Sequence, residues 1–223
     1  MELLDHFVAI CLYDARVGLT RAVPQASYDV QEYVSVHVPG SHHRCDLSAG
    51  EKLVISITAF GYCPGPVVRR DGARPGDVVA VSGTLGYSYA GLDLLEGGHV
   101  DPSARGVEQL GDLAPFVETY RAPSPPLGSG VTAAAAGARA MMDLSDGPAA
   151  DATRIAKASG VVIEFDRPAI EEEAWHLQAP ALICRVDPVR WVLQGGEEHG
   201  MLAVFPQDAR LPEGFRVLGR ARA

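Results

Sequence analysis

The spacing of hydrophobic residues differs between successive segments of the first 66 residues. Apolar side chains recur at three- and four-residue steps over residues 2–18, which predicts an amphipathic helix. Residues 19–50 show no sustained period, so we expect an irregular segment there, around a short strand at residues 33–38. An apolar run at residues 53–60 predicts a buried strand, which the glycines and prolines of residues 61–66 end.

Beyond residue 67, strand patterns alternate with helical ones. Short apolar runs beside turns predict strands at residues 77–82, 161–165 and 201–205. Helical spacing or composition predicts helices at residues 87–95, 112–121, 132–140, 149–159 and 187–194. Strands and helices mix throughout, so the expected fold class is α/β (α+β), a mixed sheet with flanking helices.

The length and the turn-rich break together predict two parts. The 223 residues are enough for one large domain, or for one domain with part of another. Because the pattern changes after residues 61–66, we expect one unit at residues 1–66 and a second at residues 67–223.

Composition narrows the class of protein. Hydrophobic residues make up 47% and charged residues 21%, as in ordinary globular domains. The net charge of −9 argues against a nucleic-acid partner, but not against a phosphate ligand, since metal ions can supply positive charge. No apolar run reaches membrane-spanning length, and the first residues lack the layout of a signal peptide. Four scattered cysteines without paired spacing favour a reducing, cytoplasmic location.

Two carboxylates, Asp143 and Asp146, lie three positions apart around Ser145. Negative side chains held this close usually share a cation or a proton. Oxygen-rich clusters suit Mg²⁺, which brings phosphates with it. The simpler interpretation is a helix N-terminus with Ser145 or Asp146 as the N-cap. These residues alone leave both interpretations open.

Two glycine-containing turns are further candidates. Residues 83–88 join a strand to a helix and could present backbone N–H groups to a phosphate, or simply pack the helix on the sheet. At residues 195–199, two glycines permit close backbone approach, and Glu197 and Glu198 could orient a cationic ligand; a polar helix-to-strand turn is the alternative. Residues 42–46 are rich in metal-ligand types, but adjacent ligands without a second cluster argue against zinc.

Five segments share their order and spacing with the motifs of one enzyme family. Residues 70–77 resemble its R-x-G-A-x-x-G-D motif, and residues 83–92 its G-x-L-G-x-S-x-A-G-L motif. Residues 123–127 resemble its P-x-P-x-L turn, residues 142–147 its M-I-D-x-S-D-G segment, and residues 195–199 its G-G-E-D-Y/H motif. The family is thiamine-monophosphate kinase, in the ATP-binding superfamily that includes aminoimidazole ribonucleotide synthetase and selenophosphate synthetase.

The resemblance, over about residues 50–220, implies both a reaction and a site. ATP gives its γ-phosphoryl group to thiamine monophosphate and yields thiamine diphosphate, a transfer that depends on positioning and charge neutralisation. It also implies a C-terminal synthetase-like domain after a remnant of the ATP-binding N-terminal domain. The implied contacts are Mg²⁺ with Asp46, Asp143 and Asp146, ATP with Asp46, Arg70 and Ser145, and the cationic rings of thiamine monophosphate with Glu197.

The sequence also departs from the family pattern. The first-domain motifs G-D-D-A-A and S-D-I-A-A-M-G do not occur, and Arg44 and Cys45 replace two glycines before Asp46. Pro148 replaces a leucine, and the family's C-terminal aromatic substrate contact is missing. With these metal ligands absent, we expect little or no kinase activity from this chain alone.

Three interpretations remain at this stage. The chain is a truncated kinase that needs a partner for the lost half, a non-catalytic remnant that binds nucleotide weakly or not at all, or another superfamily member. Residues 197–199 argue against the third. The family forms homodimers through its first domain, so the loss of much of that domain argues against a dimer here.

Overall fold

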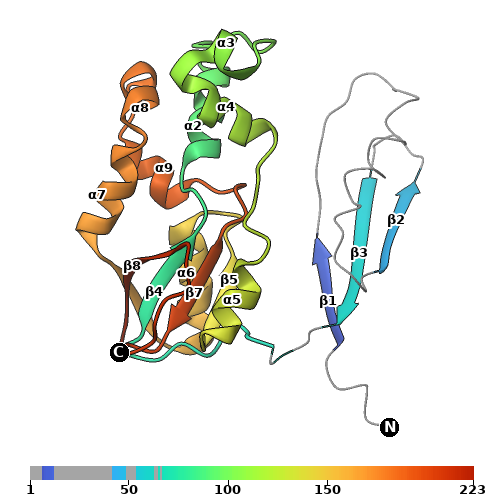
Figure 1. Cartoon of the computed structure of the whole chain (residues 1–223), viewed down its shortest axis with the longest axis vertical. Helices are drawn as coiled ribbons and strands as arrows, with labels where there is room; N and C mark the ends of the chain where they lie inside the picture. Colours follow the sequence, from blue (N-terminus) through green and yellow to red (C-terminus); the bar gives the residue numbers. More distant parts are fainter. Residues whose placement is uncertain (1–6, 13–41, 49–53, 63–64, 66) are drawn as a thin grey trace. The chain divides into compact units, whose positions relative to one another are not determined.

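The computed structural model describes residues 7–12, 42–48, 54–62, 65 and 67–223. The chain divides into two compact units, Met1–Val67 and Val68–Ala223. Each unit has a β-sheet of its own (Figure 1).

The described part of the first unit is a three-stranded antiparallel sheet. Its strands are β1 (Phe7–Leu12), β2 (His42–Ser48) and β3 (Val54–Tyr62), in the order β1-β3-β2. The strand expected at residues 53–60 is confirmed as β3, and it continues through Gly61, which pairs with Val8.

Two expectations for this unit are wrong. The helix expected at residues 2–18 is a strand over Phe7–Leu12, and the segment expected to be irregular contains the strand His42–Ser48. All six residues of β1 are apolar, and such a run suits a buried strand as well as a helix, so its spacing could not decide between them. The strand expected at residues 33–38 lies outside the described residues.

A five-stranded antiparallel sheet is the framework of the second unit (Figure 1). The strand order is β5-β7-β4-β8-β6, and each neighbouring pair is antiparallel. The strands are β4 (Val78–Ser82), β5 (Ala140–Asp143), β6 (Val162–Phe165), β7 (Met201–Phe205) and β8 (Phe215–Arg222). The α/β (α+β) class is therefore confirmed, with strand directions that are antiparallel throughout this sheet.

Short helices connect these strands. They are α2 (Tyr87–Glu96), α3 (Gly106–Leu110), the 3₁₀ turn η1 (Gly111–Leu113), α4 (Ala114–Arg121), α5 (Ser129–Ala135), α6 (Pro148–Ser159), α7 (Arg167–Trp175), α8 (Gln178–Cys184) and α9 (Pro188–Gln194). The helices expected from the sequence are confirmed in α2, η1 with α4, α6 and α9. Helices α3, α7 and α8 and strands β5 and β8 were not expected.

The helix expected at residues 132–140 is wrong over its second half. Helix α5 ends at Ala135, and Ala140 already begins β5. The alanines favour a helix by propensity, but Gly137 has a φ of +83°, which a right-handed helix does not allow. The chain therefore turns here and enters the sheet.

Side chains from both faces of the sheet are buried. Val79 and Val81 of β4 belong to the larger core, and Ala80 between them belongs to a smaller one with Ala133 of α5. Trp191 is fully buried in the larger core, where its indole N–H donates to Asp93 Oδ2 at 2.7 Å. A buried tryptophan whose only polar group is satisfied contributes strongly to stability.

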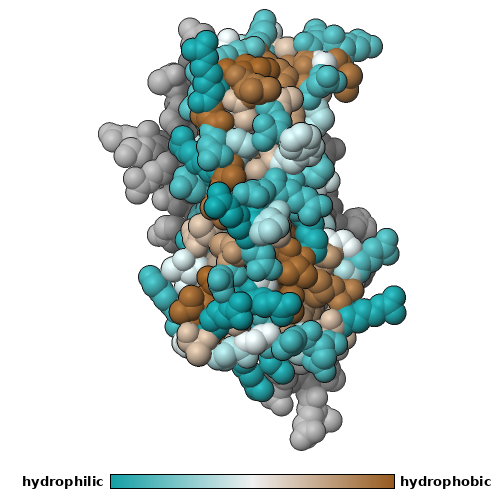
Figure 2. Space-filling model, turned by 90° about the vertical axis from the view of Figure 1, so that its left-hand side faces the viewer, coloured by the Kyte–Doolittle hydropathy of each residue, from teal (hydrophilic) through white to brown (hydrophobic). Residues whose placement is uncertain are grey.

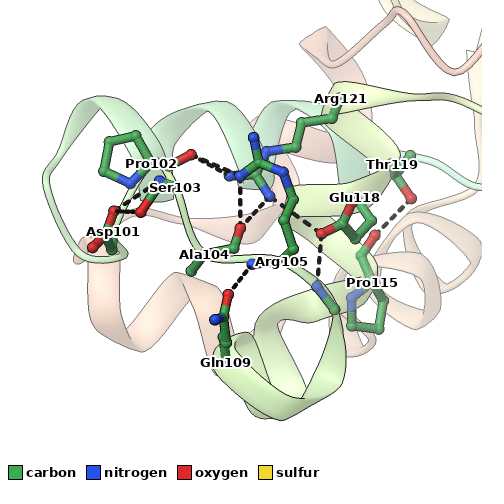
Figure 3. A network of polar contacts seen from close by, with 11 residues as sticks. Asp101, Pro102, Ser103, Ala104, Arg105, Gln109, Pro115, Glu118, Thr119 and Arg121 are labelled. Carbon is green, nitrogen blue, oxygen red and sulfur yellow. Dashed lines mark hydrogen bonds and ion pairs between the residues drawn. The ribbon is translucent and has the colours of Figure 1, made fainter.

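A network of polar contacts fastens the segment before α3 to α4 (Figure 3). The Arg121 guanidinium donates to the carbonyl oxygens of Ala104 and Pro102 at 2.7 and 2.8 Å. The backbone N–H of Arg105 donates to Gln109 Oε1 at 2.6 Å. Several of these groups are solvent-exposed, so each bond contributes little, and together they order a connection without regular structure.

Apolar surface is exposed on the side of the molecule where α7 and α8 lie (Figure 2). These helices contribute exposed Trp175, Leu182 and Ile183. Among the described residues, no helix combines the length and the apolarity that crossing a bilayer requires.

Asp187 is the N-cap of α9, and its Oδ1 accepts the N–H of Val189 at 3.0 Å. We expect Asp187→Ala to lower the free energy of unfolding by about 1 kcal/mol, because one N–H of the first turn loses its acceptor. Urea unfolding measures this loss. Asp187→Asn is the matched control, because asparagine caps about as well as aspartate. An equal loss in both variants would contradict the capping role.

Candidate functional site

Three loops of the second unit meet at one end of its strands, where β4 and β5 end and β7 begins. Met201, the first residue of β7, is paired with Ser82 at the end of β4 and also with Asp143 at the end of β5. The loop that precedes β7 therefore ends beside the points where the loops after β4 and β5 begin. The three loops are residues 83–86, 144–147 and 195–200, so three of the sequence motifs meet at this end of the strands.

The glycines of the loop 195–200 let these loops pack backbone against backbone. A Cβ atom on Gly196 would lie 2.0 Å from the carbonyl oxygen of Ser145, and one on Gly200 would lie 2.3 Å from that of Ser82. Hydrogen bonds follow the same contacts: the N–H of Glu197 donates to Ser145 O at 3.2 Å, and the N–H of Leu144 donates to Gly200 O at 2.9 Å. Only glycine fits at the two closest positions.

Glu198 points into the protein and is 5% exposed. Its Oε1 accepts the backbone N–H of Ser88 at 2.9 Å, and the main-chain amides of Gly86 and Tyr87 also favour its charged form. Burial raises the pKa of Glu198 to about 7, because the hydrogen bonds only partly offset the loss of water around the charge. Among the N–H groups that the sequence offered to a phosphate at residues 83–88, that of Ser88 is thus occupied by a carboxylate of the protein itself.

Glu197 and His199, on either side of Glu198, face solvent. Both have a positive φ, +69° and +51°, which is uncommon for residues other than glycine. His199 Nδ1 lies 3.8 Å from Asp143 Oδ2, and His199 Nε2 lies 3.8 Å from Glu197 Oε2. The structure therefore brings together Glu197 and Asp143, two of the residues expected at the site, with His199 between them.

Asp146 is half-exposed and forms an ion pair with Arg154 of α6. The same guanidinium pairs with the fully buried Asp151, whose Oδ2 accepts the N–H of Asp146 at 3.1 Å. Burial raises the pKa of Asp151 above its ordinary value, against the lowering effect of these bonds. The N-cap of α6 is Gly147, without a side-chain cap, so the expectation that Ser145 or Asp146 caps this helix is wrong.

The other expected site residues lie in different surroundings. Arg70 is exposed, and its carbonyl oxygen accepts the hydroxyl of Ser159 at 3.2 Å. Ser145 is half-buried, with its carbonyl oxygen turned to Glu197. Asp46 lies on β2 opposite Ser56 of β3, in the first unit, and its side chain is outside the described part of the chain.

Carboxylate oxygens on Asp143 and Asp146 are the donors that Mg²⁺ prefers, and proteins commonly hold this ion with one or two carboxylates plus substrate phosphates. Both side chains are half-exposed, at 53%, so phosphate oxygens and water could complete the coordination. Within the described residues, no group of three acidic, histidine or cysteine side chains could hold a metal ion unaided. By its chemistry and exposure Asp143 therefore fits a phosphate-dependent Mg²⁺ ion, whereas the carboxylate of Asp146 is already paired with Arg154.

A pocket of about 320 Å³ lies between the turn at residues 83–87 and α7. Arg216 lines this pocket, pairs with Glu173 and donates to the carbonyl oxygen of Gly83 at 2.7 Å. Burial and the nearby Glu173 raise the pKa of Tyr87, which also lines the pocket. Through Arg216, these contacts fasten the turn at residues 83–87 to α7.

Sequence reasoning missed the buried Asp151 and its partner Arg154, and it expected Glu198 to face a ligand, whereas Glu198 is buried. The spacing of Asp151 and Arg154 on one helix face was a readable signal for an ion pair. For Glu198 no such signal existed, because the groups that hold it lie about 110 positions away in the chain.

No protein-family model matches the chain. The thiamine-monophosphate kinase of Mycobacterium tuberculosis is 41% identical over 176 residues, covering 78% of this chain and 49% of the relative. The thiamine-monophosphate kinase of Methanopyrus kandleri is 33% identical over 219 residues, covering 95% of this chain and 63% of the relative. This chain is a homologue of the thiamine-monophosphate kinases.

Solved thiamine-monophosphate kinases share the fold as well. The enzyme from Aquifex aeolicus matches with a TM-score of 0.65 and 30% identity, over 78% of this chain and 56% of that chain. AaThiL complexed with AMPPCP and TMP matches with a TM-score of 0.60 and 29% identity, over 78% of this chain and 53% of that chain. The family resemblance inferred from the motifs is confirmed, and this chain spans about half the length of the kinases that it matches.

Proposed function

We propose that this chain forms part of a thiamine-monophosphate kinase. Residues 67–223 would be its C-terminal synthetase-like domain and residues 1–66 a remnant of its ATP-binding N-terminal domain. In the reaction, the γ-phosphoryl group of ATP passes to the phosphate of thiamine monophosphate, which leaves ADP and thiamine diphosphate. Homology to kinases of this name supports the proposal. The meeting of the loops 144–147 and 195–200 at one end of the strands is the observation that carries it.

The proposed roles follow from the chemistry of each side chain. Asp143 and Asp146 would hold Mg²⁺, which supplies charge neutralisation for the phosphates when bound, and for Asp46 of the first unit we keep the expected contacts with Mg²⁺ and ATP. Arg70 and Ser145 would contact ATP. Glu197 is 76% exposed beside Asp143 and His199, so its carboxylate is free to face the cationic rings of thiamine monophosphate.

We propose small molecules as the partners of this chain, and the cytoplasm as its location. The net charge of −9 supports a metal-assisted phosphate site over a nucleic-acid surface. Cys184, half-buried and free, is consistent with a reducing compartment.

Isothermal titration of the purified chain with ATP·Mg²⁺ and with thiamine monophosphate tests the proposal. We expect both ligands to bind, with little or no turnover, because each missing electrostatic group typically costs about 10²–10³ in rate. Absence of heat with both ligands would contradict the proposal and leave a non-catalytic homologue. Turnover at a rate usual for kinases would contradict the expected loss of activity.

Asp143→Asn is expected to weaken the binding of ATP·Mg²⁺ by about tenfold or more. A carboxylate that contacts a cation contributes more than about 1.4 kcal/mol, which is the free energy of a tenfold change. Titration calorimetry at fixed Mg²⁺ concentration measures the effect. Asp208→Asn is the matched control, because Asp208 is exposed and follows β7 at the opposite end of the strands. Equal weakening in both variants would contradict the metal role of Asp143.

A further inference from the structure

Glu198 is held by main-chain groups of a distant segment. The N–H groups of Gly86, Tyr87 and Ser88 belong to the start of α2, where a helix has no internal acceptors for its first amides. Glycine precedes the helix at Gly86 and offers no side-chain cap. The carboxylate of Glu198 therefore does the capping from another loop, and by doing so it joins loop 195–200 to α2.

The two neighbours of Glu198 depend on this connection. Glu197 and His199 both adopt positive φ, a conformation that residues with a Cβ keep only where their surroundings hold it. Because the residue between them is fixed inward, both side chains are directed outward, where His199 lies 3.8 Å from carboxylate oxygens of Asp143 and of Glu197. The inward anchor and the outward pair are thus parts of one backbone arrangement.

No cationic side chain among the described residues pairs with Glu198. Arg216 of β8 acts on this carboxylate only through its charge, because its guanidinium is directed to Glu173 of α7 and to the carbonyl oxygen of Gly83. Tyr87 is the other titratable group that senses this carboxylate. The anchor is the hydrogen bond from the N–H of Ser88, supported by the amides of Gly86 and Tyr87, so it depends on the length and the acceptor atoms of the side chain at position 198.

We propose that Glu198 is a positioning residue, whose buried carboxylate fastens loop 195–200 to the first turn of α2 and so holds His199 between Asp143 and Glu197. The ligand that these outward side chains meet rests on the proposed function. The anchoring itself does not, so the two can be tested apart.

Amide ¹H–¹⁵N spectra of the full chain test the anchoring directly. In Glu198→Gln, one acceptor oxygen becomes a donor, and we expect the signals of residues 86–88 and those of Glu197, His199 and Asp143 to move together. In the comparison variant Glu197→Gln, the signals of residues 86–88 should stay in place. Glu198→Asp keeps the charge on a shorter side chain and should give smaller shifts at both groups of residues. Glu198→Asp also provides the test of the anchoring if Glu198→Gln does not fold.

Ligand binding adds a second readout. Glu198→Gln should weaken the binding of thiamine monophosphate about tenfold, as we also expect for Glu197→Gln. Glu198→Asp should recover part of this loss. Shifts confined to residues 86–88 and to the two sequence neighbours of position 198, with the Asp143 signal unchanged in both Glu198 variants, would overturn the proposal, because the carboxylate would then stabilise the helix only. If the unaltered chain binds no thiamine monophosphate, the proposed function fails, whereas the spectra still decide the positioning role.

Discussion

Gly196→Ala is expected to destabilise the second unit by about 3 kcal/mol and to abolish ligand binding at the loop 195–200. The added Cβ would lie 2.0 Å from the carbonyl oxygen of Ser145 and 2.6 Å from its carbonyl carbon, so main chain must move. Overpacking of this kind typically costs about 1–3 kcal/mol. The N–H of Glu197, which donates to the same oxygen, would lose about 1 kcal/mol more. Urea unfolding and titration with thiamine monophosphate measure the two effects.

Gly128→Ala is the matched control for this substitution. A Cβ on Gly128 meets no heavy atom within 4 Å, and its φ of −78° suits alanine. We expect a change within about 0.5 kcal/mol, as for other surface positions without special contacts. If the two variants unfold at the same denaturant concentration and bind alike, the close contact between loops 195–200 and 144–147 does not exist in solution.

In the elements that the sequence predicts well, the hydrophobic periodicity agrees with the glycines and prolines that mark where the element begins and ends. Strand β4 is apolar and follows the turn at Gly76, and α6 begins with Pro148 and ends before Gly160 in a left-handed conformation. In both cases the local signal and the tertiary environment favour the same structure, so no long-range information is needed.

Strand β8 shows why other elements were missed. Its sequence mixes three arginines with apolar residues and contains Gly219, which usually weakens a strand. The glycine is required by the neighbouring strand, because a Cβ there would lie 2.1 Å from the carbonyl oxygen of Glu164. Only the sheet explains this residue, and the sheet is not visible in the local sequence.

The candidate site also has a part that the motifs predict and a part that depends on packing. The motifs predicted Asp143 and Glu197 as site residues, and both carboxylates are exposed, Asp143 at the end of β5 and Glu197 in the loop 195–200. Glu197 and Glu198 are adjacent and chemically identical, yet one is 76% exposed and the other 5%. Their different environments depend on the amides of α2, and the pairing of Asp146 with Arg154 depends likewise on how α6 starts. Such differences arise from packing and cannot be predicted from residue type.

Glu198 should also make the stability of the second unit depend on pH. Its pKa is about 7 in the folded chain against 4.5 for an ordinary glutamate, so the folded state holds this proton more tightly than the unfolded chain. The contribution to stability is therefore complete below about pH 4.5, is lost progressively as the pH rises to about 7, and stays constant above that. Because one pKa unit corresponds to about 1.4 kcal/mol, the loss between pH 5 and pH 8 is about 2 kcal/mol.

The comparison with Glu198→Gln isolates this effect, because glutamine does not titrate. Other groups, among them Asp151 with its raised pKa, contribute equally to both proteins and cancel in the difference. The free energy of unfolding of the unaltered chain minus that of the variant should thus fall by about 2 kcal/mol from pH 5 to pH 8, measured by urea unfolding at each pH. A difference that does not change with pH would mean that Glu198 is ionised in the folded chain over this whole range, which its burial without a paired cation opposes.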